Sequence, residues 1–287
     1  RFTSFYPYCA ESTPSFRAVR LPLRNPYLFM GTPFLANSQV GVFYPLNWPL
    51  WWLLPAYRSV HLTIVLHLCL AALNAYVWGR TSLRMRRLGA WAVGCIYALG
   101  GYLGAQVEHV NQLQGLAWLP LMLMLWDGTR KRGSEGAKGQ SQMPGLWFFG
   151  LALVIGLIFL AGHTQTAFIM LVGLAAYGLG PGLWRALRWR EWRPLLRQLA
   201  LLAGATALGM ALAAVQLIPT WELLRLSVRA GGLPFNERVS FSLSPSYLAR
   251  ALLPGFAGAV PPEHIEYVAY VGVAGLALAV LAIVNRQ

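Results

Sequence analysis

Side chains that could bind a polar substrate or move a proton gather in three short stretches between long apolar runs. The stretches are EHVNQLQ (108–114) with Glu108, His109, Asn111, Gln112 and Gln114, LAGHTQTAF (160–168) with His163 and Gln165, and QLIPTWELLR (216–225) with Gln216, Glu222 and Arg225. Amides bind hydroxyl groups, and an imidazole or a carboxylate can accept a proton in general base catalysis. Three helix ends with these groups on one membrane surface would form a pocket for a polar substrate.

A second interpretation needs no substrate. Loops outside a membrane are wet, and polar side chains at helix ends often cap backbone groups or bind water. In WELLRLSVR (221–229), Glu222, Arg225 and Arg229 follow helical spacing. They could form an ion pair along an interfacial helix, or the arginines could hold a lipid phosphate. The residues alone leave both interpretations open.

The elements that position these side chains are transmembrane helices. The chain is 57% hydrophobic and 11% charged, with a mean hydropathy of +0.51, whereas soluble domains carry about 25% charged residues. Several uncharged runs approach or exceed the roughly 17 to 20 residues that a spanning helix needs. Alternating strand patterns are absent, so we predict an all-α polytopic membrane protein. The predicted spans are 59–78, 88–106, 113–127, 146–162, 166–184, 199–218 and 267–284.

Residues 1–58 precede the first predicted span and are rich in proline and aromatic residues. Trp48, Trp51 and Trp52 suit the membrane interface, where aromatic rings are enriched. The chain opens on Arg1 and stops just past an apolar run, so we expect it to be a piece of a longer protein. The predicted organisation is an outer loop with interfacial helices, 1–58, followed by a transmembrane domain, 59–287, that includes a long outer segment, 219–266.

The basic residues predict the orientation of the helices. One set of loops carries fourteen basic side chains against three acidic ones, and the opposite set carries nine against six. The first set holds Arg80, Arg84, Arg86, Arg87, Arg130, Lys131, Arg132, Lys138, Arg185, Arg188, Arg190, Arg193, Arg197 and Arg286. The positive-inside rule places this set in the cytoplasm and the three polar stretches outside. Because the arginines are spread between apolar runs, no nucleic-acid partner is predicted.

Other side chains give weaker indications. His67 lies within a span, where a lone histidine is more often hydrogen-bonded to a neighbouring helix than part of a proton path. Cys9, Cys69 and Cys95 form no CxxC pair, so neither a disulfide framework nor a zinc site is predicted. The segment EHIE (263–266) lacks a second ligand cluster, and no metal site is predicted there.

Blocks along the whole chain resemble the YfhO family of bacterial membrane proteins. The blocks, in family order, are LPLRNPYLFMGTPFLANSQVGVFYPLN (21–47), EHVNQLQGLAWLPLMLM, GHTQTAF, AVQLIPTWELLRLSVRAGG, SLSPSYLARALLPGFAG and YVGVAGLALA. That family is similar to the GT-C glycosyltransferases, multi-span enzymes that take a sugar from a polyprenyl-phosphate carrier on the outer leaflet. The resemblance implies a GT-C-like bundle of about seven spans in a bacterial cytoplasmic (inner) membrane.

The resemblance also points to particular residues, and the chemistry of their side chains indicates what each could do. Asn37 and Gln39 match the first block, His109 and Asn111 the second, His163 and Gln165 the third, and Gln216 and Glu222 the fourth. An essential acid is expected early in the first outer loop, before Arg1, since Glu11 does not occupy that place. Glu108, His163 and Glu222 are the candidates for proton transfer within the chain. The amides and His109 would bind sugar hydroxyls, and Arg225 or Arg229 would stabilise the leaving phosphate.

The predicted reaction is transfer of a sugar from a polyprenyl-phosphate-linked donor, a membrane lipid, to an acceptor at the cell surface. A divalent cation is left open as a cofactor, although no DxD motif is present. The alternatives are a transporter or flippase of lipid-linked sugar and a non-catalytic scaffold for envelope assembly. Confinement of the polar residues to the outer ends of the helices, away from the midplane, disfavours transport.

Overall fold

The computed structural model describes residues 5–27, 31–134, 145–227, 230–232, 234–239 and 270–284. It is 78% helical, which agrees with the predicted all-helical class. The elements are α1 (Phe5–Arg17), β1 (Arg24–Asn25), β2 (Thr32–Pro33), η1 (Ser38–Val40), α2 (Asn47–Leu53), α3 (Ala56–Thr81), α4 (Arg87–Ala98), α5 (Gly101–Ala105), η2 (Gln106–Glu108), α6 (Val110–Leu116), α7 (Leu119–Ser134), α8 (Gly145–Leu160), α9 (Thr164–Trp189), α10 (Trp192–Leu212), α11 (Ala214–Arg225), α12 (Phe235–Val239) and α14 (Val273–Val284). Strands β1 and β2 pair antiparallel.

Four helical segments in the described part of the chain are long and apolar enough to cross a membrane. They are Ala56–Thr81, Arg87–Glu108, Thr164–Trp189 and Trp192–Leu212, while Gly145–Leu160 and Gly275–Val284 are shorter apolar helices. The predicted number of about seven spans is therefore not reached among the described residues. Most of the predicted outer segment 219–266, and the start of the predicted span 267–284, lie outside these residues.

The predicted span 113–127 is divided between α6 and α7. Pro120 has no backbone N–H, so the carbonyl of Leu116 loses its helical partner at this point. The hydroxyl of Tyr97 donates to that carbonyl at 2.7 Å, and Nδ2 of Asn74 donates to the carbonyl of Ala117 at 2.9 Å. Backbone acceptors freed by the break are thus satisfied from neighbouring helices, as a buried interruption requires.

Two other predicted spans have different boundaries. Helix α10 begins at Trp192 and ends at Leu212, whereas the predicted span was 199–218, and α9 continues to Trp189 beyond the predicted end at 184. Both helices extend over arginines that were assigned to loops. Arginine stems can lie along an apolar helix while the guanidinium group reaches water, so charge alone does not end a helix.

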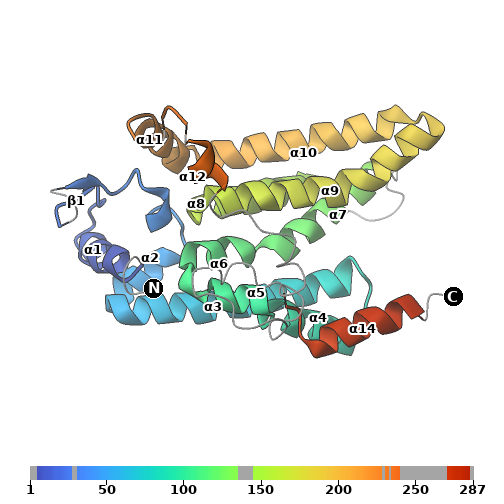
Figure 1. Cartoon of the computed structure of the whole chain (residues 1–287), viewed down its shortest axis with the longest axis horizontal. Helices are drawn as coiled ribbons and strands as arrows, with labels where there is room; N and C mark the ends of the chain where they lie inside the picture. Colours follow the sequence, from blue (N-terminus) through green and yellow to red (C-terminus); the bar gives the residue numbers. More distant parts are fainter. Residues whose placement is uncertain are drawn as a thin grey trace.

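The long helices lie side by side along the longest axis of the molecule (Figure 1). Helix α3 packs on α4, and α10 packs on both α8 and α9. Close approach of α3 and α4 depends on Gly94, because a Cβ there would lie 2.8 Å from the carbonyl oxygen of Ala72. The turns from α3 to α4 and from α9 to α10, which carry many of the arginines, lie at one end, and α1, α2, β1 and α11 lie at the other (Figure 1).

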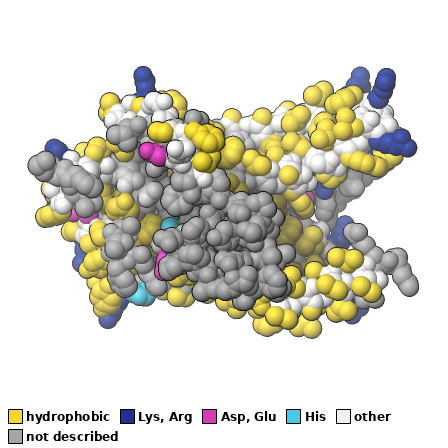
Figure 2. Space-filling view, in the orientation of Figure 1, with side chains coloured by type: hydrophobic (Ala, Val, Ile, Leu, Met, Phe, Trp, Pro, Cys, Tyr) yellow, Lys and Arg dark blue, Asp and Glu magenta, His cyan; other side chains and the backbone are white. Residues whose placement is uncertain are grey.

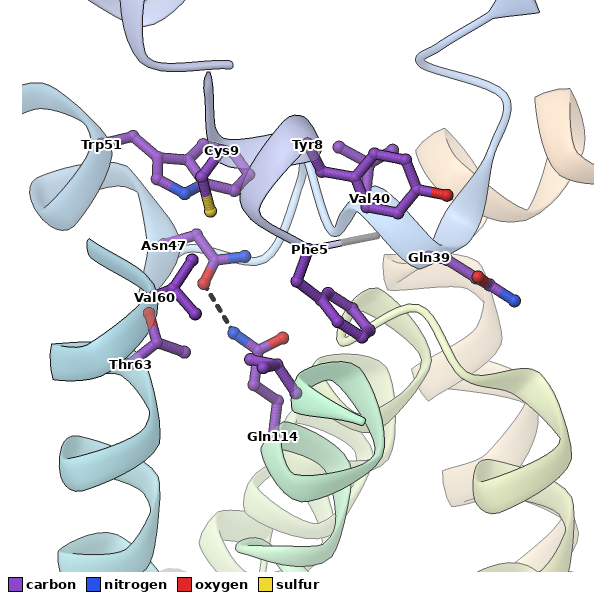
Figure 3. A pocket seen from close by; sticks show the side chains of 11 residues that line it. Phe5, Tyr8, Cys9, Gln39, Val40, Asn47, Trp51, Val60, Thr63 and Gln114 are labelled. Atoms are coloured by element: carbon purple, nitrogen blue, oxygen red, sulfur yellow. Dashed lines mark hydrogen bonds between the residues drawn. The ribbon is translucent and has the colours of Figure 1, made fainter. Parts of the chain in front are cut away.

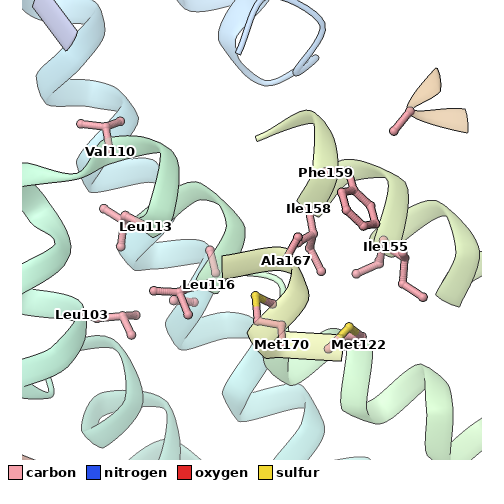
Figure 4. Close-up of a cluster of buried hydrophobic side chains, with 14 of the residues drawn as sticks. Leu103, Val110, Leu113, Leu116, Met122, Ile155, Ile158, Phe159, Ala167 and Met170 are labelled. Carbon is pink, nitrogen blue, oxygen red and sulfur yellow. The ribbon is translucent and has the colours of Figure 1, made fainter. Parts of the chain in front are cut away.

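Helices α6 to α9 share a hydrophobic core (Figure 4). Leu113 and Leu116 of α6 meet Met122 of α7, Ile158 of α8 and Met170 of α9, all of them buried. On the outside of the bundle, hydrophobic side chains cover much of the described surface, and Lys and Arg lie at its margins (Figure 2). Large apolar side chains on both the inside and the outside are typical of helices that face lipid.

Candidate functional site

The loop before α2 connects segments that are far apart in the sequence. The carbonyl oxygen of Leu35 accepts a hydrogen bond of 2.9 Å from Nε2 of Gln216, and that of Ala36 accepts one of 2.9 Å from Oγ1 of Thr220. Gln216 is fully buried in α11. Its side chain is therefore engaged in fastening α11 to the outer loop.

The joint between α8 and α9 packs against the same loop. Gly162 has a φ of +95°, and a Cβ on it would lie 2.0 Å from the carbonyl oxygen of Ser38. Only glycine permits both this conformation and this close approach. The turn η1 and the joint between α8 and α9 are therefore in direct backbone contact.

Asn37 organises this loop from within. Its Oδ1 accepts a hydrogen bond of 3.1 Å from the backbone N–H of Gln39, which caps η1, and its Nδ2 donates to the hydroxyl of Tyr8 at 3.2 Å. Asn is a preferred residue at such a cap because its short side chain reaches a backbone N–H two residues ahead. Asn37 therefore shapes the loop and attaches it to α1, while Gln39 lines a neighbouring cavity.

That cavity lies between α1, η1, α2, α3 and α6 (Figure 3). It is lined by Phe5, Tyr8, Cys9, Gln39, Val40, Asn47, Trp51, Val60, Thr63, Val110 and Gln114. Its volume of about 20 Å³ is enough for about one water molecule. The lining combines amides with aromatic rings, and these groups can bind sugar hydroxyls and the apolar face of a sugar ring. The cavity as it stands is too small for a whole sugar.

Two amides meet at the cavity wall. Nε2 of Gln114 donates to Oδ1 of Asn47 at 2.6 Å, and Nδ2 of Asn47 donates to the carbonyl oxygen of Gly41 at 3.1 Å (Figure 3). Both side chains are buried. Helix α6 carries two further buried amides, Asn111 and Gln112. This concentration of amides in one buried helix is unusual because each polar group must find a partner.

A buried chain of hydrogen bonds lies beside the cavity. Nδ1 of His67 lies 2.7 Å from the carbonyl oxygen of Thr63, which can only accept, so Nδ1 carries the proton. Nε2 of neutral His67 then accepts from the hydroxyl of Tyr44 at 2.8 Å, and Tyr44 accepts from Nε1–H of Trp118 at 2.9 Å. Burial raises the pKa of the Tyr44 phenol, an effect that the bond from Trp118 opposes. His67 is thus bonded to the loop before α2 and to its own helix, whereas a partner on a neighbouring helix was predicted.

His163 caps the first turn of α9. Its Nδ1 accepts from the backbone N–H of Thr166 at 3.2 Å and lies 2.7 Å from Oγ1 of the same residue. With Nδ1 as the acceptor, the proton of the neutral ring is on Nε2. A general base needs a lone pair directed at the substrate, so this tautomer of His163 would act as a hydrogen-bond donor.

The remaining predicted site residues lie on the surface or at its edge. Glu108, Gln165, Glu222 and Arg225 are exposed, and His109 is half-buried just before α6. Glu222 and Arg225 form no ion pair, although both belong to the described part of α11. Arg229 lies outside the described residues. None of the described residues that line the cavity is a carboxylate.

Sequence reasoning missed Asn47, Tyr8 and Thr63, which line the cavity. One signal was present: Asn47 is a lone amide between proline and tryptophan residues in FYPLNWPLWW. An amide in so apolar a context indicates a specific partner.

Within the described parts of the chain, no group of three or more His, Cys, Asp or Glu side chains is placed to hold a metal ion. No protein-family model matches the chain, and comparison with curated proteins and with solved structures finds no match.

Proposed function

We propose that the chain is a membrane glycosyltransferase-like protein of GT-C type that resembles the YfhO family. It transfers a sugar from a polyprenyl-phosphate-linked donor to an acceptor at the outer cell surface. The proposal includes about seven spans in a bacterial inner membrane, with α7, α8 and α14 added to the four long apolar helices. The arginine-rich turns face the cytoplasm, and the end that carries α1, α2 and α11 faces outward.

One observation carries the proposal: three polar segments that are far apart in the sequence meet at one loop. Residues 35–38 of that loop contact Gly162, Gln216 and Thr220, and Asn47, a few residues further along, bonds to Gln114. These are the segments in which amides, imidazoles and carboxylates were found. Their position at the end of the bundle is where a lipid-linked sugar of the outer leaflet would present its sugar.

The geometry supports different roles for the predicted residues. Gln216 and Asn37 hold backbone groups and shape the site. His163 and Gln39 are the side chains for binding sugar hydroxyls, and the buried pair of Asn47 and Gln114 holds the loop beside them. Exposed Arg225 stabilises the leaving phosphate, while Glu108 and Glu222 are the candidate acids for proton transfer.

The test is transfer of a labelled hexose from polyprenyl phosphate by the full-length protein in liposomes that contain envelope acceptor. Glu222→Gln should lower the rate, whereas Glu191→Gln, which removes an exposed acid beside the arginines, should not. His163→Asn and His163→Ala separate two roles, since Asn is a good helix cap and Ala is not. Loss of transfer in both variants indicates that the imidazole acts on the substrate. Full activity of His163→Asn would limit His163 to capping.

A second candidate is movement of lipid-linked sugar across the membrane without transfer. The specific observation in its favour is that no carboxylate is among the described residues lining the cavity. Labelled lipid would then cross the bilayer of protein-containing liposomes while no labelled acceptor forms. That result would exclude the transferase and retain the binding site.

A further inference from the structure

The first turns of α3 carry a guanidinium group and an imidazole on the surface that faces away from the bundle. Arg58 and His61 are both exposed and lie three residues apart, so they share one face of the helix. Nδ1 of His61 donates to the carbonyl oxygen of Tyr57 at 2.6 Å, because a carbonyl can only accept. The guanidinium carbon of Arg58 lies 5.6 Å from the centre of the Tyr57 ring. The guanidinium group is left to bind an anion, and Nε2 of His61 is left to accept a hydrogen bond.

A groove begins at these side chains and continues along α3. It has a volume of about 540 Å³ and is lined by Leu54, Tyr57, Arg58, His61, Leu62 and Val65. Leu62 and Val65 are 44% and 54% exposed, which leaves an apolar channel directly below the polar rim. This order, a cationic rim followed by an apolar channel, matches a ligand with an anionic head and a hydrocarbon tail.

The groove is separate from the cavity of the proposed active site. Val60 and Thr63 line that cavity, whereas Arg58, His61 and Leu62 occupy the opposite face of the same turns. The helix body lies between the two sites. A ligand in the groove therefore contacts lipid on its open side and does not reach the amides of α6.

The charge around the groove is positive. Nε and Nη2 of Arg17 donate to the carbonyl oxygens of Trp52 and Leu54, each at 3.2 Å, and this brings a second cation to the rim. No carboxylate among the described residues lies within 4.0 Å of Arg17, Arg58 or His61. The rim can hold a phosphate group, but none of these described carboxylates is placed to pair with the ammonium group of a zwitterionic lipid.

We propose that this groove binds an anionic phospholipid of the surrounding bilayer. The phosphate accepts charge-assisted hydrogen bonds from Arg58, and one acyl chain lies over Leu62 and Val65. From Tyr57 to Val65 the helix rises about 12 Å, which is within the roughly 15 Å of one leaflet. Exposed Trp52 and Tyr57 beside the rim suit the headgroup level at which such a phosphate lies.

The test is native mass spectrometry of the full chain, titrated with phosphatidylglycerol and phosphatidylcholine that carry the same acyl chains. Both lipids carry a phosphate, but only the choline ammonium group is repelled by the positive rim, so the intact chain should bind phosphatidylglycerol about tenfold more tightly. The double variant Arg58→Gln/His61→Gln should lose this preference. Arg20→Gln removes an exposed charge from the same outer loop and should keep it.

A second variant tests the apolar part of the groove. Leu62→Gln leaves the charge unchanged, and we expect it to weaken both lipids while the ratio between them stays the same. The side chains of Arg58, His61 and Leu62 are exposed. Thermal unfolding checks that each variant folds. Equal binding of the two lipids by the intact chain, or an unchanged preference in the double variant, overturns the proposal. Displacement of phosphatidylglycerol by an equal concentration of inorganic phosphate overturns it as well, because the site would then recognise phosphate alone.

Discussion

Nε2 of Gln114 donates a hydrogen bond of 2.6 Å to Oδ1 of Asn47, and both side chains are buried. The bond joins α6 to the outer loop at the start of α2. Nδ2 of Asn47 continues the connection to the carbonyl oxygen of Gly41, in the turn that follows η1. A buried amide pair of this kind fixes the position of the loop relative to the bundle, since either partner alone would leave an unsatisfied polar group.

Removing either amide should destabilise the fold by about 1–3 kcal/mol because the other is left buried without a partner. We therefore expect a coupling free energy of about 0.5–3 kcal/mol between Asn47→Ala and Gln114→Ala. Chemical unfolding in detergent of the two single variants and the double variant measures it. Gln165→Ala, at an exposed position, is the control and should change stability by less than about 0.5 kcal/mol. Additive effects of the two amides would show that the bond does not couple α6 to the loop.

Gly162→Ala should detach the outer loop from the α8–α9 joint. The backbone there has a φ of +95°, and the new Cβ would lie 2.0 Å from the carbonyl oxygen of Ser38. Strain of this kind costs about 1–3 kcal/mol before the clash is counted. The thermal midpoint should fall, and transfer or binding of the lipid-linked sugar should fall with it.

Gly173→Ala is the matched control for that substitution. Gly173 lies within α9, and a Cβ there would meet nothing within 4 Å. Alanine favours a helix over glycine by about 0.5–1 kcal/mol, so this variant should be as stable as the parent or more stable. A fall in stability of equal size in both variants would mean that the contact with Ser38 is not the cause.

The sequence was informative about which segments are polar and much less so about what their side chains do. His163 and Gln216 were identified as site residues from their types and places. In the structure His163 caps α9, and Gln216 fastens α11 to a carbonyl 181 residues away. Composition does not distinguish an amide that binds backbone from one that faces a substrate. That distinction depends on contacts between distant segments.

The boundary between α6 and α7 was not predicted, and the reason is local. The run LAWLPLMLMLW (116–126) is uniformly apolar, so hydropathy alone predicts one continuous span. Pro120 removes one hydrogen bond from that span, and the break is stable only because Tyr97 and Asn74 donate to the freed carbonyls. The proline was visible in the sequence. The two donors, which come from α4 and α3, were not recognisable as its partners.

Tyr44→Phe should leave two buried groups without partners. The Tyr44 hydroxyl accepts from Nε1–H of Trp118 and donates to Nε2 of His67. Each unsatisfied group costs about 1–3 kcal/mol, so we expect a loss of about 2–5 kcal/mol in the free energy of unfolding. Tyr27→Phe, at a residue 85% exposed, should change it by less than about 0.5 kcal/mol. A change below 1 kcal/mol in Tyr44→Phe would indicate that water replaces the hydroxyl.

The thiol of Cys9, in the wall of the cavity, should react slowly with alkylating agents. Burial raises its pKa to about 11, while a hydrogen bond with the Trp51 side chain lowers it in part. At pH 8 the reactive thiolate is therefore about a hundredfold scarcer than in the unfolded chain. Modification by iodoacetamide, followed by mass spectrometry of the Cys9 peptide in the native and the denatured protein, measures the ratio.

The same shift predicts how stability depends on alkaline pH. Because the folded pKa of Cys9 lies above the unfolded value of 9.0, the unfolded chain loses its proton first as the pH rises. The contribution of the neutral thiol is complete below about pH 9 and is lost between about pH 9 and pH 11. Thermal unfolding of the parent and of Cys9→Ala across this range isolates the contribution, since other groups titrate in both. A difference between their midpoints that does not change with pH would show that the thiol ionises as readily in the fold as in the open chain.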